Sequence, residues 1–80
     1  MSMTVEELQG LKGRTFVHFK GKRYRLEDFA TDSETLETMV VYRQLYGEGA
    51  LWVRPAKMFV ETVSRDGYVG PRFRLSEAES

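Results

Sequence analysis

The sequence contains no cysteine and a single histidine, His18. Without cysteine there can be no disulfide framework, no thiolate zinc cluster and no cysteine nucleophile, and this composition is typical of a reducing compartment. A metal site on His18 would have to recruit carboxylates alone, because no His-x-x-x-His or Cys-x-x-Cys spacing is present. We therefore predict no metal and no cofactor, and we expect His18 to be a hydrogen-bonded, partly buried structural residue.

Long hydrophobic segments are also missing. No uninterrupted apolar run is longer than Met39 to Tyr42, whereas a membrane-spanning helix needs about 20 such residues. The first residues lack the basic-then-apolar order of a signal peptide. A chain of 80 residues supports one modest core, which excludes large multi-layer enzyme folds. We predict a single cytoplasmic domain over residues 1–80 that does not contact a membrane.

Neither sign of charge is in excess, because 12 basic and 12 acidic side chains give a net charge of zero. This balance argues against a dedicated nucleic-acid or acidic-membrane binder. The charges are nevertheless segregated, with only basic side chains over residues 12–25 and only acidic ones over residues 27–37. One interpretation is that the two runs pair across neighbouring strands. The alternative is a nucleic-acid surface that combines His18 with Lys12, Arg14, Lys20, Lys22, Arg23 and Arg25.

The first residues predict a short helix. Thr4 and Glu7 have capping-box spacing, in which each side chain accepts a hydrogen bond from the other residue's backbone N–H. Apolar residues at helical spacing extend this pattern over residues 5–11, and we assign the segment 1–13 to it. We expect this helix to cap one end of a sheet.

From residue 14 onward the hydrophobic period changes to two, which predicts strands joined by tight turns. Pro55 stops one strand and suits the first position of a helical turn that ends near Met58. Asp66-Gly67 is a strong tight-turn dipeptide. The predicted strands cover residues 14–19, 23–29, 37–46, 51–54, 59–64 and 72–75. The polar, acidic tail over residues 76–80 is predicted to be disordered.

These elements predict a mainly β fold. Strands this short would leave exposed edges in an open sheet, and closure removes them. We therefore predict a small closed or half-closed antiparallel β-barrel over residues 14–75.

Several segments resemble a known family. They are His18-Phe19-Lys20-Gly21, Tyr24, Ser33-Glu34-Thr35, Val41-Tyr42-Arg43, Leu45-Tyr46-Gly47, Leu51-Trp52-Val53-Arg54-Pro55, Met58-Phe59 and Arg72-Phe73. Together they resemble the bacterial family called domain of unknown function 1653. The resemblance implies an SH3-like barrel in a small cytoplasmic bacterial protein, and it implies no activity.

Aromatic and arginine side chains form the main candidate site. SH3-like barrels often bind partners on aromatic-lined grooves, and arginine adds recognition of anions. The competing interpretation is an ordinary core, since so small a protein has few large side chains to fill its interior. We predict a peptide, a protein or a small anion as the partner, and we do not predict the oligomeric state. The predicted ligand-binding residues are His18, Tyr42, Arg43, Tyr46, Trp52 and Arg54.

Glu61 is predicted to lie on the apolar face of its strand, shared with Phe59 and Val63. A carboxylate there needs a partner, and Arg43 and Arg54 occupy similar positions in their own strands. We predict a structural clamp between Glu61 and one of these arginines. The alternative is that the arginine is displayed to an external anion and Glu61 only orients it.

Enzymatic activity is not predicted. A small enzyme centred on His18 and Glu34 would require both side chains in one pocket. A serine triad with Ser33 and Asp32 lacks a cleft and an oxyanion hole. The Gly-x-Gly at residues 47–49 precedes a strand rather than a helix, so it is read as a hairpin turn and not as a phosphate loop.

Overall fold

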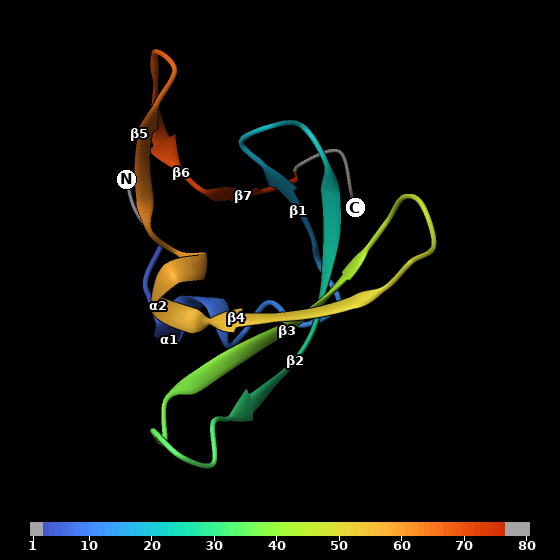
Figure 1. Ribbon diagram of the computed structural model, residues 1–80, viewed down its shortest axis with the longest axis vertical. Coiled ribbons are helices and arrows are strands. Elements are labelled where there is room, and N and C mark those ends of the chain that lie inside the picture. Colours follow the sequence, from blue (N-terminus) through green and yellow to red (C-terminus); the bar gives the residue numbers. More distant parts are fainter. Residues whose placement is uncertain (1–2, 77–80) are drawn as a thin grey trace.

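The structure is a computed structural model that describes residues 3–76. Within these residues, seven strands and two short helices follow one another along the chain (Figure 1). Five strands form one antiparallel sheet in the order β4-β3-β2-β1-β7, and β5 pairs with β6 in a separate hairpin. The elements are α1 (Val5–Leu8), β1 (Thr15–His18), β2 (Arg23–Thr31), β3 (Thr38–Gln44), β4 (Leu51–Pro55), α2 (Ala56–Phe59), β5 (Thr62–Arg65), β6 (Tyr68–Pro71) and β7 (Phe73–Leu75).

The capping box predicted at the start of α1 is present. The Thr4 hydroxyl accepts a hydrogen bond from the Glu7 backbone N–H at 3.1 Å, and the Thr4 N–H donates to the Glu7 carboxylate at 2.9 Å. The helix ends at Leu8, earlier than predicted. Leu8 itself is fully buried and fixes the helix to the core.

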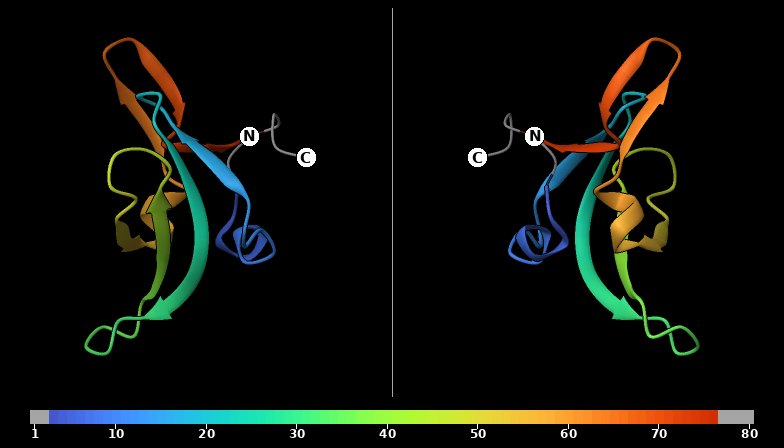
Figure 2. Two further views of the ribbon diagram at one scale, coloured as in Figure 1. Left: turned by 90° about the vertical axis from the view of Figure 1, so that its right-hand side faces the viewer. Right: turned by 90° about the vertical axis from the view of Figure 1, so that its left-hand side faces the viewer.

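The long strand β2 determines the curvature of the sheet. It pairs with β1 on one side and β3 on the other, and its register with β3 shifts between Leu26 and Asp28. Such a bulge bends a strand and increases its twist. Figure 2 shows the result, a curved β2 that runs from the β1–β2 turn at one end of the molecule to the β2–β3 turn at the other.

The core lies against one face of this sheet. Phe16, Leu26 and Tyr42 point to that face and are almost completely buried. The helix α2 covers them, because the Phe59 ring stacks on the Phe73 ring at a centroid distance of 4.0 Å and meets the Tyr42 ring edge-on at 5.5 Å. Edge-to-face and offset ring pairs of this kind add stability beyond their buried area.

The predicted segment 59–64 requires correction. Phe59 ends α2, and β5 begins only at Thr62. The helical turn that Pro55 starts is therefore longer than predicted, so Glu61 lies in the connection between helix and strand. Alternation along a strand cannot place Glu61 on the face of Phe59.

The predicted mainly β, antiparallel fold is confirmed, but a closed barrel is not. β4 and β7 are the two ends of the strand order, and within residues 3–76 no ladder joins them. Over the same residues, no helix is long and apolar enough to cross a membrane.

The predicted disordered tail begins too early. Ser76 is buried, its N–H donates to the Thr15 carbonyl at 2.9 Å, and its hydroxyl accepts from Arg23 at 2.9 Å. Residues 77–80 of the predicted tail lie outside the described residues.

Candidate functional site

His18 lies at the end of β1, on the core face of the sheet and at its rim. Its ring meets the Phe73 ring edge-on at 5.0 Å, and its Nδ1 accepts a hydrogen bond from the Lys20 backbone N–H at 3.1 Å. The side chain is half-buried. The predicted hydrogen-bonded, partly buried histidine is therefore what the structure contains, and the turn holds the ring in one orientation.

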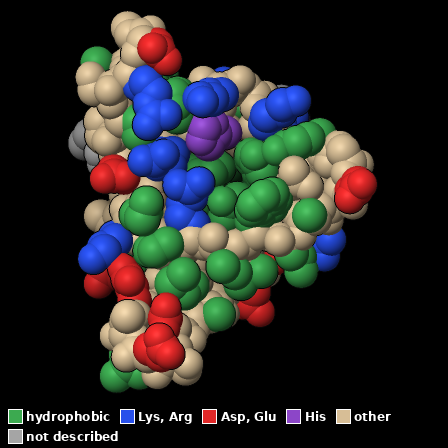
Figure 3. Space-filling view, in the orientation of Figure 1, with side chains coloured by type: hydrophobic (Ala, Val, Ile, Leu, Met, Phe, Trp, Pro, Cys, Tyr) green, Lys and Arg blue, Asp and Glu red, His purple; other side chains and the backbone are tan. Residues whose placement is uncertain are grey.

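Four cations surround this histidine. Burial lowers the pKa of His18, and the charges of Arg54, Arg72, Lys20 and Arg65 lower it further. The ring is therefore neutral at physiological pH. Figure 3 shows the single histidine with lysine and arginine side chains around it and a hydrophobic area beside it on the same face. We call His18, Lys20, Arg54, Arg65 and Arg72 the His18 cluster.

Different elements bring these arginines together. Arg54 comes from β4, donates from its Nε to the Tyr42 hydroxyl at 3.2 Å, and lies 5.8 Å from the centre of the Phe73 ring. Arg65 ends β5 and lies 6.0 Å from the centre of the Phe19 ring. Aromatic faces thus hold two guanidinium groups beside His18, an arrangement that favours cations.

Arg72 connects β6 to β7. One of its terminal nitrogens donates to the Glu61 carboxylate at 2.9 Å, and only 16% of the side chain is exposed. Its Nε is buried and has no hydrogen-bond partner among the described residues. Most buried polar atoms are paired, so this one stands out.

Little negative charge compensates the cluster. Glu61 is the one carboxylate that an ion pair joins to it within residues 3–76. Over the same part of the chain, no ion pair is found for Lys20, Arg54 or Arg65. The site therefore has excess positive charge on partly exposed side chains.

The predicted ligand-binding residues do not form one patch. Tyr42 is 4% exposed and belongs to the core, whereas its register partner Trp52 on β4 is 50% exposed. Both point to the same face, so the difference arises because β3 is central and β4 is an edge strand. Trp52 and Arg54, two residues apart on one face, do lie together as predicted.

Tyr46 lies at the hydrophobic side of the site. Its hydroxyl is 2.6 Å from the Tyr24 hydroxyl, and the Lys22 ammonium lies 4.7 Å from its ring centre. Burial and this hydrogen bond raise the pKa of Tyr24, and the same hydrogen bond lowers the pKa of Tyr46. Either hydroxyl can be the donor in this hydrogen bond.

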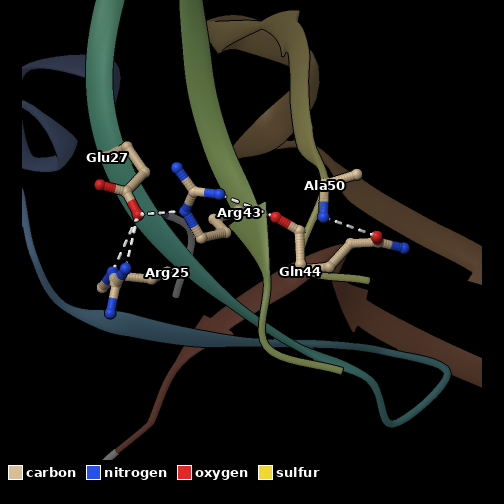
Figure 4. Close-up of polar contacts among 6 residues, drawn as sticks. Arg25, Glu27, Arg43, Gln44 and Ala50 are labelled. Carbon is tan, nitrogen blue, oxygen red and sulfur yellow. Dashed lines mark hydrogen bonds and ion pairs between the residues drawn. The ribbon is translucent and has the colours of Figure 1, made fainter. Parts of the chain in front are cut away.

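Arg43 is the predicted ligand-binding residue that the structure separates from the rest. It lies next to Tyr42 on β3, so it points to the opposite face of the sheet. Its Nε donates to Glu27 at 3.1 Å, as Figure 4 shows. Its Nη1 donates to the Gly49 carbonyl at 2.8 Å. Arg25 donates to the same carboxylate at 2.9 Å, and this hydrogen bond and the one from Arg43 lower the pKa of Glu27.

The predicted clamp at Glu61 has a different partner. Its carboxylate pairs with Arg72, while Arg43 pairs with Glu27 and Arg54 bonds to Tyr42. The prediction was wrong because it assumed that Glu61 belongs to a strand. The register of the β5–β6 hairpin, in which Thr62 pairs with Pro71, places Arg72 opposite Glu61, and the Arg72 N–H donates to the Glu61 carbonyl at 2.8 Å.

The segregated charges pair in part, but the pairs do not join neighbouring strands. Lys12, which precedes β1, bonds to Asp28 on β2 at 3.1 Å, and Arg25 pairs with Glu27 within β2. The cross-strand partner of Glu27 is Arg43, which lies outside both runs. Several members of the basic run therefore serve the fold. Lys20 and Lys22 instead lie on the face of the His18 cluster.

The pair proposed for a small enzyme does not form. His18 precedes β2 and Glu34 follows it, so the whole strand lies between them, about 30 Å at about 3.3 Å per residue. Figure 1 shows the two turns at opposite ends of the molecule. The two side chains cannot share a pocket.

Arg65 is the site residue that sequence reasoning missed. It is the last residue of β5, immediately before the Asp66-Gly67 turn. The turn was recognisable, and the pairing of Arg65 with Tyr68 follows from it. The docking of the hairpin beside His18 had no local signal.

Comparison with known proteins places the chain among proteins of unknown function. A family model described as protein of unknown function DUF1653 matches residues 14–75. The crystal structure of a DUF1653 protein from Bordetella bronchiseptica matches with a TM-score of 0.70 and 31% sequence identity, covering 82% of this chain and 87% of that one. No curated protein matches. The chain belongs to the DUF1653 family.

Proposed function

We propose that this protein is a non-enzymatic binding module that recognises a phosphate-bearing small anion at the His18 cluster. The observation that carries the proposal is the group of four cations around a neutral histidine, with Glu61 as the one ion-paired carboxylate in the described part of the chain. Like charges gathered without compensation repel one another, and a bound anion would relieve that repulsion.

The donors suit a tetrahedral oxyanion. Arginine presents a planar fork of N–H groups that matches phosphate oxygens, and charge-assisted hydrogen bonds are the stronger ones. Arg54 is held by Tyr42 through its Nε, which leaves its terminal nitrogens for a ligand. Arg72 is held in place by Glu61, which accepts from one of its terminal nitrogens at 2.9 Å. The neutral His18 ring adds a donor at Nε2, because its Nδ1 already accepts from Lys20.

The hydrophobic area beside the cluster would receive the rest of such a ligand. Trp52 exposes half of its side chain on the face that Arg54 shares, and Tyr46 is partly exposed on the same side. Aromatic faces next to cations suit a molecule that combines a planar apolar group with a phosphate.

The SH3-like arrangement belongs to this proposal. A curved antiparallel sheet with a hairpin folded beside it supports a half-open relative of such a barrel, in which the exposed rim rather than a closed interior carries the site. A cytoplasmic location in a bacterial cell is proposed with it, supported by the lack of cysteine.

Calorimetry with inorganic phosphate and with pyrophosphate tests the proposal. We expect binding at low ionic strength, and we expect Arg54→Gln to weaken it about tenfold, the effect of losing roughly one charge-assisted hydrogen bond. Arg74→Gln is the matched control, because Arg74 is exposed and points to the other face of the sheet. Absence of binding by the unaltered protein, or equal losses in both variants, would refute the proposed function.

A nucleic acid remains the second candidate, because Lys20 and Lys22 of the basic run lie on this same face. Binding through phosphates makes log affinity fall linearly with log salt, by about one unit for each phosphate contacted. A single-stranded oligonucleotide whose salt slope reaches several units would favour this candidate over a small anion. A slope near one would favour the small anion.

A further inference from the structure

The outer edge of β4 is an unpaired strand edge that carries apolar side chains. β4 ends the sheet, and within residues 3–76 no strand pairs with it on the side away from β3. Its residues Leu51, Trp52 and Val53 are 53%, 50% and 61% exposed. Natural proteins avoid exposed, uncharged strand edges, since such edges pair with other chains.

The remaining edges carry protective features. β7 has the exposed Arg74 at its centre, β5 ends in Arg65, and β6 contains Gly70 and Pro71. Charges, glycine and proline are the usual means of blocking strand addition. The β4 edge carries no charged residue, glycine or proline from Leu51 to Val53. This difference from the other edges favours an additional strand as its partner.

The hydrogen-bond phase of β4 determines which groups face outward. The Gln44 N–H donates to the Ala50 carbonyl at 2.9 Å, and the register of β3 with β4 is regular from there. Along antiparallel strands, hydrogen-bonded residue pairs alternate with pairs that are not hydrogen-bonded. The backbone N–H and C=O groups of Trp52, two residues after Ala50, therefore point toward β3. The N–H and C=O groups of Leu51 and Val53 therefore point to the open edge.

We propose that a second copy of this chain adds to β4 by antiparallel strand pairing, with Trp52 on the two-fold axis. In this register Leu51 faces the partner's Val53, and all outward N–H and C=O groups of these two residues are paired. A shift that puts Val53 on the axis places Leu51 opposite the partner's Pro55, which has no N–H to donate. The opposite shift, with Leu51 on the axis, places Val53 opposite the partner's Gly49. The φ of Gly49 is 67°, which a strand residue does not adopt.

A second copy fits better than a foreign strand because the edge is complementary to itself. The proposed pairing joins Leu51 to Val53 on one face and the two Trp52 rings on the other, so only apolar side chains meet at its centre. Arg54 lies opposite Ala50, away from the partner's Arg54. The net charge of zero leaves little overall repulsion between copies.

The dimer would place both His18 clusters on one face of a continuous sheet. Arg54 of one copy and the partner's Arg54 are then separated by four residues along the strand direction, about 13 Å at about 3.3 Å per residue. The strand pairing itself requires only the β4 edge, so it does not depend on the proposed anion site.

Sedimentation equilibrium over a wide concentration range tests the proposal, with the emission of Trp52, the only tryptophan, as a second readout. Because the proposed contact is confined to a few residues of one strand in each copy, we expect a weak dimer that forms between about 10 µM and about 1 mM. The mass should rise from 9.3 kDa toward twice that value, with a blue shift of the emission as the two rings meet.

Val53→Lys and Val69→Lys form a matched pair, because Val69 is a 73% exposed valine on another strand. We expect the first variant to stay monomeric and the second to associate like the unaltered chain. If Val53→Lys prevents folding, Val53→Pro removes the outward N–H, replaces the side chain and removes no hydrogen bond to β3, so it should also give a folded monomer. A chain that is monomeric at every concentration, or equal association in the Val53 and Val69 variants, would overturn the proposal.

Discussion

Tyr42→Phe separates the positioning of Arg54 from the packing of the core. The substitution keeps the ring that contacts Phe59 and Phe73 and removes only the hydroxyl that accepts from Arg54 at 3.2 Å. Arg54 would then lose the contact that directs its guanidinium toward the His18 cluster. We expect a modest loss of stability and a separate loss of anion affinity.

The two magnitudes follow from the geometry. A hydrogen bond to a charged group contributes about 1.5–3 kcal/mol. This one is long and Arg54 is only partly buried, so we expect the free energy of unfolding to fall by about 1 kcal/mol, or about 4–8 °C in melting temperature. Reordering a free arginine on binding costs about 0.5–1.5 kcal/mol, which weakens phosphate binding about 2- to 10-fold.

Urea denaturation and calorimetry with inorganic phosphate measure these effects. Tyr24→Phe is the control, since its hydroxyl bonds to Tyr46 and not to a member of the His18 cluster. That variant should lose stability but keep its affinity for phosphate. If Tyr42→Phe binds phosphate as tightly as the unaltered chain, then Tyr42 does not position Arg54 and the reasoning fails.

Three further predictions concern the same residues. The pKa of His18 is lowered in the folded state, so between that pKa and the unfolded value of 6.5 the unfolded chain binds more protons; the stability that this group contributes should be present above pH 6.5 and lost as the pH falls, which urea midpoints at several pH values would show. An NMR titration of the His18 ring should give a pKa below 6.5, and that pKa should rise when phosphate is added. Glu61→Gln should lower the free energy of unfolding by about 0.5 kcal/mol, because the ion pair with Arg72 is partly exposed, and it should tighten phosphate binding, because it removes the carboxylate that is paired with the cluster. A loss of several kcal/mol in the free energy of unfolding would mean that the ion pair is a buried clamp. Phe59→Ala should cost about 3–5 kcal/mol, a large part of the total stability of so small a domain, and a thermal melt that stays unchanged would contradict the assigned core.

The elements that sequence reasoning predicted correctly depend on neighbouring residues. Thr4 and Glu7 are three positions apart, so one helical turn brings their atoms together whatever the rest of the chain does. Asp66 and Gly67 both have positive φ, 54° and 80°, as a tight hairpin turn of this type requires. The length of α2 was misjudged because its last turn depends on the burial of Phe59 among rings from β1, β3 and β7.

The candidate site was predictable only in part. Trp52 and Arg54 share a face because alternation along a strand is local, and this pairing was expected from their spacing. Side chains alternate along β3 as they do along β4. Arg43 is one residue from the core residue Tyr42, so it points to the opposite face of the sheet, where it pairs with Glu27. Periodicity alone could not show which face of β3 is covered.

By itself, the order of residues determined the type of most elements, several of the turns between them and the absence of disulfides, because each depends on the conformational preferences of a few adjacent residues or on composition. The strand β6 was not among the predicted elements. Only the tertiary structure decided that Arg65 joins His18, and that Trp52 is exposed while Tyr42 is buried. These outcomes depend on which strand occupies the edge of the sheet and where the β5–β6 hairpin docks. Such placements arise from contacts between residues far apart in the chain, for which short-range patterns carry no information.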